Sequence, residues 1–336
     1  MDFLFHREVK TRLFFRTGAL VLALLFLSGC GRNETYSITF GGDIMLARGG
    51  EPLVEDWQSI DLSLPKNLEN SSGGNYYAAA LESPLVNDLM TDIIANPEMN
   101  LCAESREIQI LSNSGVDILS FNNNHQYDCS DHEALETQRL LEESGFIPFQ
   151  QSEGIWVSNY PDSQFAIIAV DVISGQMDEE LVTGTVRKEK SDGKFVIVST
   201  HWGNEYQAGP DEKQQSLAQS WVDAGADVIW GHHPHVLQRA EWLTSNEDKH
   251  KALVMYSLGN LLADQFMLED ARRSALIRLD VKNDQIIKIM ILPAAFNWEK
   301  KSLSFDLQKD ETTRILDRLN LESDKSTLVE IYSPGD

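Results

Sequence analysis

The apolar positions of the chain fall into two kinds of run. Short runs rich in β-branched and aromatic residues predict strands at Tyr36–Phe40, Val116–Phe121, Phe165–Val170, Phe195–Ser199, Asp227–Trp230 and Ala252–Leu258. Longer segments with apolar residues at helical spacing predict helices at Glu104–Ser114, Asp131–Ser144 and Asp211–Ala224, each followed by a glycine. The alternation of strands and helices favours an α/β fold with mainly parallel strands.

The C-terminal part has a different pattern. Ala275–Val281 and Gln285–Leu292, separated by a polar three-residue turn, predict an antiparallel hairpin. Residues 301–336 read as a polar extension with one helical patch near Thr313–Leu321. Because no linker interrupts the preceding pattern, we expect a single domain over residues 37–300.

The N-terminal residues have the pattern of a bacterial lipoprotein signal. Four basic residues precede an apolar run, Ala19–Leu27, and small residues then lead to Cys30. This pattern predicts a signal peptide over residues 1–29, lipidation of Cys30 and a lipidated tether over residues 30–36. A transmembrane anchor is the alternative, but the apolar run is well short of the roughly 20 residues that a span requires. We therefore expect an extracytoplasmic protein held at a bacterial membrane by lipid.

The chain is strongly acidic, with a formal net charge of -24. Residues 1–29 contain four basic and two acidic residues, so their removal would make the charge -26. Such a surface repels nucleic acid and anionic lipid headgroups, so we expect no nucleic-acid partner and membrane contact through the anchor alone. In an oxidising compartment Cys102 and Cys129 could form a disulfide, which their positions neither require nor exclude.

Polar motifs follow directly after several of the apolar runs. They are GGDIML (residues 41–46), NNNHQYD (122–128), HWGNEY (201–206), GHHPH (231–235) and YSLGN (256–260). Because the carboxyl ends of parallel strands lie at one edge of a sheet, we expect these motifs to build one polar site.

The histidines of these motifs are candidate metal ligands. His233 and His235, two residues apart, could reach two neighbouring metal ions, or one ion and a substrate oxygen. The alternative is a chance pair of surface histidines, which the presence of His232 beside them disfavours. His201 alone would more often be a structural residue, but its company favours a ligand role.

The remaining polar candidates are weaker when each is taken alone. Asn124 and His125 supply an amide oxygen and an imidazole, and Asp128 could hydrogen-bond His125 and set its tautomer. Without the other motifs a polar turn would be the favoured interpretation. Glu82 alone reads as a solvated glutamate. Together with Asp43, these residues form an oxygen and nitrogen set without thiolate, which suits one or two ions of Mn, Fe or Zn better than Ca or Mg.

These motifs in this order resemble the CapA (poly-γ-glutamate biosynthesis protein) family, whose fold is similar to that of the calcineurin-like metallophosphoesterases. The resemblance runs from about Ile38 to Gln265. It implies a four-layer α/β/β/α sandwich. It also implies that Glu82 bridges two metal ions and that His125 lies beside the substrate as a proton donor. The metal ligands that it implies are Asp43, Glu82, Asn124, His201, His233 and His235.

The chain departs from the pattern at three places. Phosphoesterases usually carry Asp-x-His in the first motif, whereas the third position here is Met45, so one metal would lack a histidine. Ala80 replaces the family's asparagine near the glutamate. Cys129 and Ser130 replace the aromatic residue and glycine that usually follow Asp128.

Three functions remain open from the sequence. The first is a role in the synthesis, export or retention of an extracellular anionic polymer of the poly-γ-glutamate type. The second is a metal-dependent hydrolase acting on a phosphoester or an amide. The third is a scaffold with a structural metal centre in a membrane complex, for example with a polymer synthase. The acidic surface would repel polyglutamate unless metal ions, or a patch near Arg239 or Arg272–Arg273, offset it locally.

Overall fold

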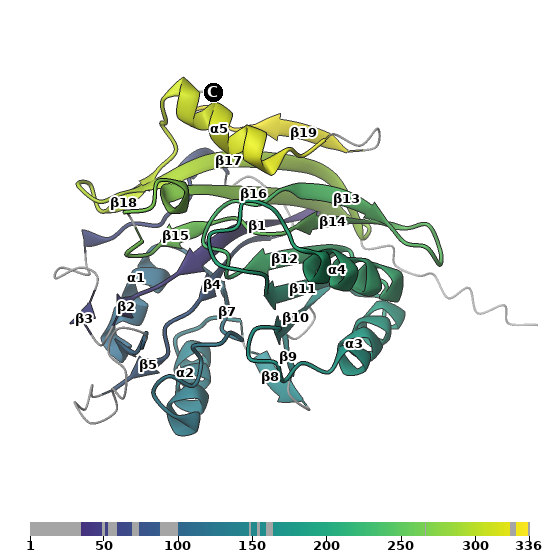
Figure 1. Cartoon of the computed structure of the whole chain (residues 1–336), viewed down its shortest axis with the longest axis horizontal. Helices are drawn as coiled ribbons and strands as arrows, with labels where there is room; N and C mark the ends of the chain where they lie inside the picture. The colour runs from purple at the N-terminus through teal and green to yellow at the C-terminus, as the bar shows by residue number, and fades with distance from the viewer. Residues whose placement is uncertain are drawn as a thin grey trace, which may run out of the picture. The chain divides into compact units, whose positions relative to one another are not determined.

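The computed structural model describes residues 35–48, 51–52, 59–68, 74–87, 100–147, 149–152, 155–158, 164–265, 267–322 and 327–334. These residues form a mixed α/β unit, as the sequence predicts (Figure 1). The predicted signal peptide and Cys30 lie outside the described residues. Among the helices of the described part, none is long and apolar enough to cross a membrane.

The first sheet has the strand order β18-β17-β16-β1-β4-β7, with β15 beside β1 and β19 beside β17. Strand β1 runs parallel to β4 and β15, whereas β16 and β17 form the predicted antiparallel hairpin. The strands are β1 (Thr35–Ile44), β4 (Asn75–Leu81), β7 (Ile118–Ser120), β15 (Asn260–Leu262), β16 (Arg273–Lys282), β17 (Gln285–Asn297), β18 (Ser302–Ser304) and β19 (Leu328–Ile331).

The second sheet has the order β13-β14-β12-β11-β10-β9-β8, and its central strands β10, β11, β12 and β14 are parallel. The strands are β8 (Phe149–Ser152), β9 (Ile155–Ser158), β10 (Phe165–Asp171), β11 (Phe195–His201), β12 (Val228–His232), β13 (Ala240–Thr244) and β14 (Lys251–Met255). Two short pairs lie apart from both sheets: β2 (Ala47–Arg48) with β3 (Glu51–Pro52), and β5 (Leu85–Val86) with β6 (Ala103–Glu104).

The α-helices are α1 (Ile108–Asn113), α2 (Asp131–Glu143), α3 (Glu179–Ser191), α4 (Glu212–Ala224) and α5 (Lys309–Leu319), and short 3-10 turns lie at Lys66–Leu68, Ser105–Glu107 and Asp270–Arg272. Helix α4 begins at a capping box, in which the Asp211 carboxylate and the Gln214 side chain accept each other's main-chain N–H groups. It ends at Gly225, whose φ of 111° only glycine adopts readily. The predicted helix at Glu104–Ser114 is shorter than expected, because a 3-10 turn precedes α1.

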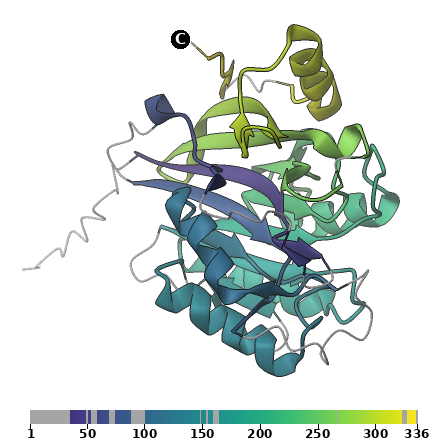
Figure 2. The same ribbon diagram turned by 90° about the vertical axis from the view of Figure 1, so that its left-hand side faces the viewer.

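Three hydrophobic layers hold the sheets and helices together. Ile38 and Phe40 of β1 pack against Ile197 and Trp230 of the second sheet in a buried core between the sheets. The outer face of the second sheet packs on α3 and α4, and the outer face of the first packs on α1 and α2. Figure 2 shows α1 and α2, in blue, in front of the sheet that carries β1. The helices thus flank the two sheets and leave the strand ends for polar residues.

The segment expected as a polar extension, residues 301–336, contributes to the first sheet. Strand β18 pairs antiparallel with the end of β17, at residues 295–297, and β19 pairs parallel with its middle part, at residues 288–291. Ile315 and Leu319 of α5 are fully buried against the β16–β17 hairpin. Helix α5 lies over β17 in Figure 1. Most polar positions of α5 face solvent, while Ile315 and Leu319 complete the core beneath it.

Candidate metal centre

The two sheets place polar side chains at a shared rim. Asp43 lies near the carboxyl end of β1, and His201 and His232 are the last residues of β11 and β12. A hydrogen bond joins the sheets here, since the His233 N–H donates to Asp43 Oδ2 at 3.1 Å. The motifs that follow these strands therefore meet in space, as the strand pattern predicts.

Asp43, Glu82 and His235 form an inner group of three buried side chains. One ligand atom of each lies within 4.8 Å of the other two. His235 Nδ1 lies 3.3 Å from Asp43 Oδ2, 3.7 Å from Glu82 Oε1 and 3.0 Å from Asn260 Oδ1. His232 Nδ1 approaches the other oxygen of Asp43 at 3.3 Å. Two carboxylates and an imidazole in this arrangement are a suitable donor set for a transition metal.

The GHHPH turn holds its histidines in an uncommon backbone conformation. His233 has a φ of 92° and His235 a φ of 57°, both in the left-handed region, which costs roughly 1 to 3 kcal/mol for each such residue. Before them, Gly231 packs so closely that a Cβ would lie 2.1 Å from the carbonyl oxygen of Tyr256. The packing beneath the turn thus forces the two imidazoles toward the rim, and such strain is typical of functional sites.

His201 and His233 form a second contact at the rim, with their ring centroids 4.7 Å apart. Burial lowers the pKa of His201 well below its usual value, and the nearby His233 adds to this effect. Burial and the neighbouring His235 lower the pKa of His233 to about 4. Both imidazoles are therefore neutral near pH 7, which is the form that binds metal.

His125 and Asp128 form a hydrogen-bonded pair on the loop after β7. His125 Nδ1 lies 2.9 Å from Asp128 Oδ2, and the Leu101 N–H also donates to that oxygen at 2.9 Å. Burial lowers the pKa of His125, but the carboxylates of Asp128 and Glu82 together outweigh this effect, and the net shift is upward. The pairing leaves Nε2 of the same ring as the atom that can act on a substrate.

A disulfide between Cys102 and Cys129 fixes this loop. Cys102 follows Leu101 and Cys129 follows Asp128, so the disulfide holds the two chain segments together beside the hydrogen bond from the Leu101 N–H to Asp128. The cysteine pairing that the sequence left open is thus present.

Burial and mutual attraction set the charges of the inner group. Burial raises the pKa of Glu82 to about 7, although His235 opposes this effect. Burial alone would raise the pKa of Asp43, but the imidazoles of His232 and His235 outweigh it and the pKa falls. Burial likewise disfavours the charged form of His235, yet Glu82 and Asp43 raise its pKa to about 10. In the metal-free protein, the protonated imidazole of His235 thus supplies the positive charge beside the carboxylates of Asp43 and Glu82.

Several buried polar atoms at the rim have no hydrogen-bond partner among the described residues. These atoms are both carboxylate oxygens of Glu82, Oδ1 of Asp43, Oδ1 of Asn124 and Nε2 of His201. A buried polar atom without a partner costs about 1 to 3 kcal/mol. A divalent cation bound by Asp43, Glu82 and His235 would give the unpartnered oxygens of Asp43 and Glu82 a partner, so the residues of the inner group fit such an ion.

The structure brings the sequence-predicted residues together to different degrees. Asp43, Glu82 and His235 form the inner group, His201 contacts His233, and the His125–Asp128 pair lies on a neighbouring loop. The ligand roles of all these residues and of Asn124 stay predictions. Sequence reasoning did not assign a role to Asn260, although it lies in the YSLGN motif and contacts His235. It also missed the Glu205 carboxylate.

Met45 does not face the donor set as a ligand. Its side chain packs with Leu101 and Ala263 in a small buried cluster, and its sulfur accepts a hydrogen bond from Arg48 Nη2 at 3.3 Å. The inner group therefore contains one histidine of the GHHPH turn and none from the first motif.

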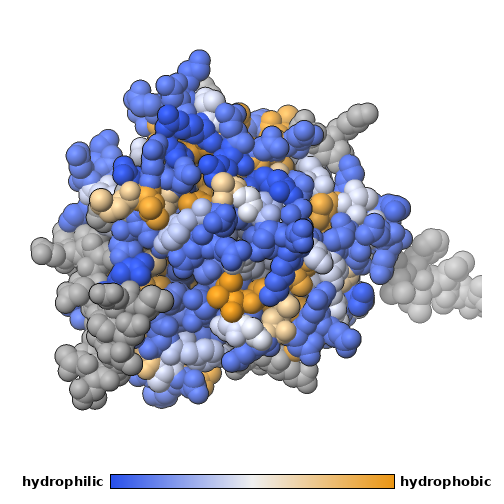
Figure 3. Space-filling model, viewed as in Figure 1, coloured by the Kyte–Doolittle hydropathy of each residue, from blue (hydrophilic) through white to orange (hydrophobic). Residues whose placement is uncertain are grey.

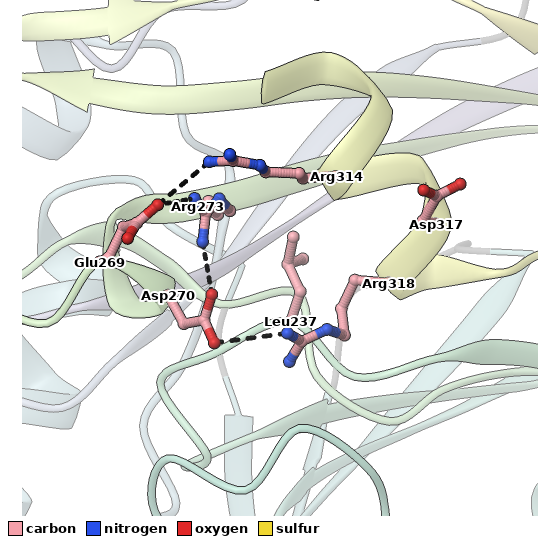
Figure 4. Close-up of a pocket in the computed structure, with 7 residues that line it drawn as sticks. All are labelled: Leu237, Glu269, Asp270, Arg273, Arg314, Asp317 and Arg318. Carbon is pink, nitrogen blue, oxygen red and sulfur yellow. Dashed lines mark hydrogen bonds and ion pairs between the residues drawn. The ribbon is translucent and has the colours of Figure 1, made fainter. Parts of the chain in front are cut away.

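A separate cleft of about 430 Å³ lies between α5 and the segment before β16 (Figure 4). Three arginines and three carboxylates line it, so its formal charge is balanced. Arg273 pairs with Glu269, Asp270 and Glu311, and Arg314 and Arg318 pair with the first two of these acids. The cleft is a network of ion pairs that ties α5 to the sheet.

The stacked sheets, the flanking helices and the buried carboxylate–imidazole cluster at the strand ends define a protein of the metallophosphoesterase-like class. The chain belongs to the bacterial capsule synthesis protein family PGA_cap, a member of that superfamily, whose sequence profile matches residues 37–265. The match confirms the family resemblance inferred from the motifs.

Two relatives support the assignment. Over 287 residues the chain is 28% identical to the capsule biosynthesis protein CapA of Bacillus anthracis, and the alignment covers 78% of this chain and 67% of that protein. Over 281 residues it is 26% identical to the PGA biosynthesis protein CapA of Bacillus subtilis (strain 168), and this alignment covers 78% of this chain and 72% of that protein.

Proposed function

We propose that this chain takes part in the synthesis, export or retention of an extracellular anionic polymer of the poly-γ-glutamate type. The family membership and the names of the two CapA relatives support this role. The observation that carries the metal-dependent part of the proposal is the Glu82 carboxylate. It is buried beside Asp43 and His235, and no residue that the structure describes gives it a hydrogen bond.

The proposed centre holds one or two divalent ions of Mn, Fe or Zn. Its ligands would be Asp43, Glu82, Asn124, His201, His233 and His235. When bound, such an ion polarises a carboxylate, amide or phosphoryl oxygen and lowers the pKa of a coordinated water.

The positive charge of such a centre would offset the repulsion between the acidic surface of the protein and an anionic polymer. Hydrophilic side chains cover most of the face seen in Figure 3, and the net charge is -24. Neither Arg239 nor Arg273 offers an unpaired cation to a polyanion, because Arg239 pairs with Glu241 and stacks over the Tyr256 ring, and Arg273 pairs with three acids. A bound metal ion would instead supply positive charge for an anionic polymer at the rim.

We also propose that the chain works outside the cytoplasm, anchored by lipid at Cys30, next to the membrane proteins that make the polymer. The Cys102–Cys129 disulfide supports this location, since disulfides persist in oxidising compartments. Mass spectrometry of the purified chain tests it, because removal of residues 1–29 and diacylation of Cys30 give a defined mass. An unmodified N-terminus would contradict this part of the proposal.

The decisive experiment measures retention of poly-γ-glutamate by the full chain in the presence of Mn²⁺ and after EDTA treatment. We expect binding with the metal and its loss with the chelator or with Glu82→Gln. Glu142→Gln is the matched control, because Glu142 is exposed on α2 and far along that helix from the His125 loop. Equal retention by the chelated protein would contradict the proposal.

Hydrolysis is a second candidate function, favoured by the His125–Asp128 pair. Asp128 accepts a hydrogen bond from Nδ1 and raises the pKa of the ring, so in its charged form the imidazole carries a second proton on Nε2, which it can donate to the leaving group of an amide or phosphoester. The test is turnover of γ-glutamyl amides and phosphoesters by the metal-loaded chain. His125→Ala should lower the rate by about 100-fold or more while metal content stays unchanged. Absence of turnover with metal bound would leave the polymer-binding role alone.

A further inference from the structure

Glu205 lies beside the inner group in a position that the family resemblance did not assign. One carboxylate oxygen of Glu205 and one ring nitrogen each of His233 and His235 lie within 4.8 Å of one another. The two histidines are buried and Glu205 is exposed. This second group of potential ligands therefore shares His235 with the inner group and lies on its solvent side.

The loop that carries Glu205 is fastened to the GHHPH turn on both sides. Before Glu205, the Trp202 N–H donates to the His232 carbonyl at 3.2 Å, and after it the Tyr206 N–H donates to the Pro234 carbonyl at 2.8 Å. These main-chain bonds bracket the glutamate. The backbone of Glu205 is consequently held beside the two histidines by the fold.

The neighbouring glycine makes this approach possible. Gly203 has a φ of 81°, and a Cβ at this position would lie 2.6 Å from the side-chain amide carbon of Gln214. Gln214 itself belongs to the capping box of α4. The loop conformation is thus set by the start of that helix, which gives Glu205 a defined place at the rim.

An independent observation points to a ligand here. His201 is 2% exposed, and its Nε2 has no hydrogen-bond partner among the described residues. Its ring lies 4.7 Å from that of His233. A buried imidazole nitrogen without a partner, beside a carboxylate and further imidazoles, is the environment that a transition metal completes.

We propose that Glu205 is a ligand of a second divalent transition-metal ion, held with His233 and His235 on the solvent side of the inner group. This inference rests on the metal centre of the proposed function. Because Glu205 is exposed, an ion held there would have coordination positions open to solvent and substrate. These positions suit a carboxylate or phosphoryl oxygen of the substrate.

The test is the number of ions bound by the full chain, purified in detergent without chelator. Mn²⁺ is titrated while free Mn²⁺ is followed by EPR, and bound metal is checked by elemental analysis. We expect two ions in the wild type and one in Glu205→Gln, with the second ion weakened at least about tenfold. Glu142→Gln should bind two ions with wild-type affinity.

Two outcomes separate this inference from the proposal on which it rests. If Glu205→Gln binds the same number of ions as the wild type with the same affinity, while Glu82→Gln loses them, the centre stands and the role of Glu205 is refuted. If the wild type binds no Mn²⁺, Zn²⁺ or Fe²⁺, the metal centre itself fails, and the role of Glu205 fails with it. Thermal unfolding of each metal-free variant establishes that a lost ion is not the result of misfolding.

Discussion

Replacement of Glu82 by glutamine should stabilise the metal-free protein at pH 8 and abolish its stabilisation by metal. Glutamine has nearly the same shape as a protonated glutamate but never carries a charge. The buried glutamate must ionise in a place where water cannot solvate it and where neither of its oxygens has a hydrogen-bond partner in the described part of the chain. The mutation removes that penalty together with a ligand.

The size of the effect follows from the pKa of the side chain. Burial raises the pKa of Glu82 from 4.5 to about 7, and each pKa unit corresponds to about 1.4 kcal/mol, so ionisation in the folded state costs about 3 kcal/mol. The folded state binds the proton more tightly than the unfolded state. The free energy of unfolding is therefore highest below pH 4.5, falls as the pH rises toward 7, and stays low above it.

The assay is chemical unfolding in EDTA at pH 5 and pH 8, with Glu142→Gln as the control. We expect Glu82→Gln and the wild type to be similar at pH 5 and the variant to be up to about 3 kcal/mol more stable at pH 8. With Mn²⁺ at about 100 times its dissociation constant, the wild type should gain about 2.7 kcal/mol and the variant nothing. If the two proteins differ by the same amount at both pH values, or if the variant is the less stable at pH 8, the reasoning is refuted.

Three further predictions concern the surroundings of the site. Changing both Cys102 and Cys129 to serine should lower the free energy of unfolding by about 3 to 4 kcal/mol, because the disulfide closes a loop with a sequence separation of 27 residues. Calorimetry should record a fall in Tm of about 5 °C, and an unchanged Tm would contradict this prediction. Gly42→Ala should prevent stable folding, since the new Cβ would lie 1.8 Å from a carbonyl oxygen of the segment before β15; a normal circular dichroism melt of the variant would contradict this. Asp128→Asn should lower the pKa of His125. In the wild type the charged imidazole adds stability that is complete below the unfolded pKa of 6.5 and is lost as the pH rises through the higher folded pKa, so the variant should lose part of this stability at low pH. NMR titration of His125 in the metal-free protein checks this, and a pKa equal to that of the wild type would show that another group sets it.

The convergence of the motifs was predictable because parallel strands present their carboxyl ends at one edge. Asp43 and His201 each end an apolar run, so the sequence alone indicates that they meet at a rim. The hairpin of β16 and β17 was equally clear from its two runs and its polar turn. In these cases local pattern and tertiary packing agree.

Other elements depend on packing that the sequence does not reveal. Strand β4 contains three consecutive alanines, which have no preference for strands, and it forms because β1 and β7 flank it. Helix α3 has a glycine at position 184 and several β-branched residues, which weaken its helical signal. Glu205 gave no signal of its own, because an exposed acid in a loop looks like any solvated residue until the fold brings the histidines beside it.

The position of β1 in the first sheet has a consequence for the order in which the protein can be completed. This strand is the first of the described part, yet one of its edges pairs with β16, where Ser37 faces Asp280, and Asp43 is in register with Asn260 of β15. These partners are more than two hundred residues away in the chain. Contacts of such separation form slowly, since a long loop must close before they can stabilise anything. During synthesis, β1 can pair early with β4, but its other edge stays open until almost the whole polypeptide has emerged, so the site at Asp43 is among the last parts of the molecule to be completed.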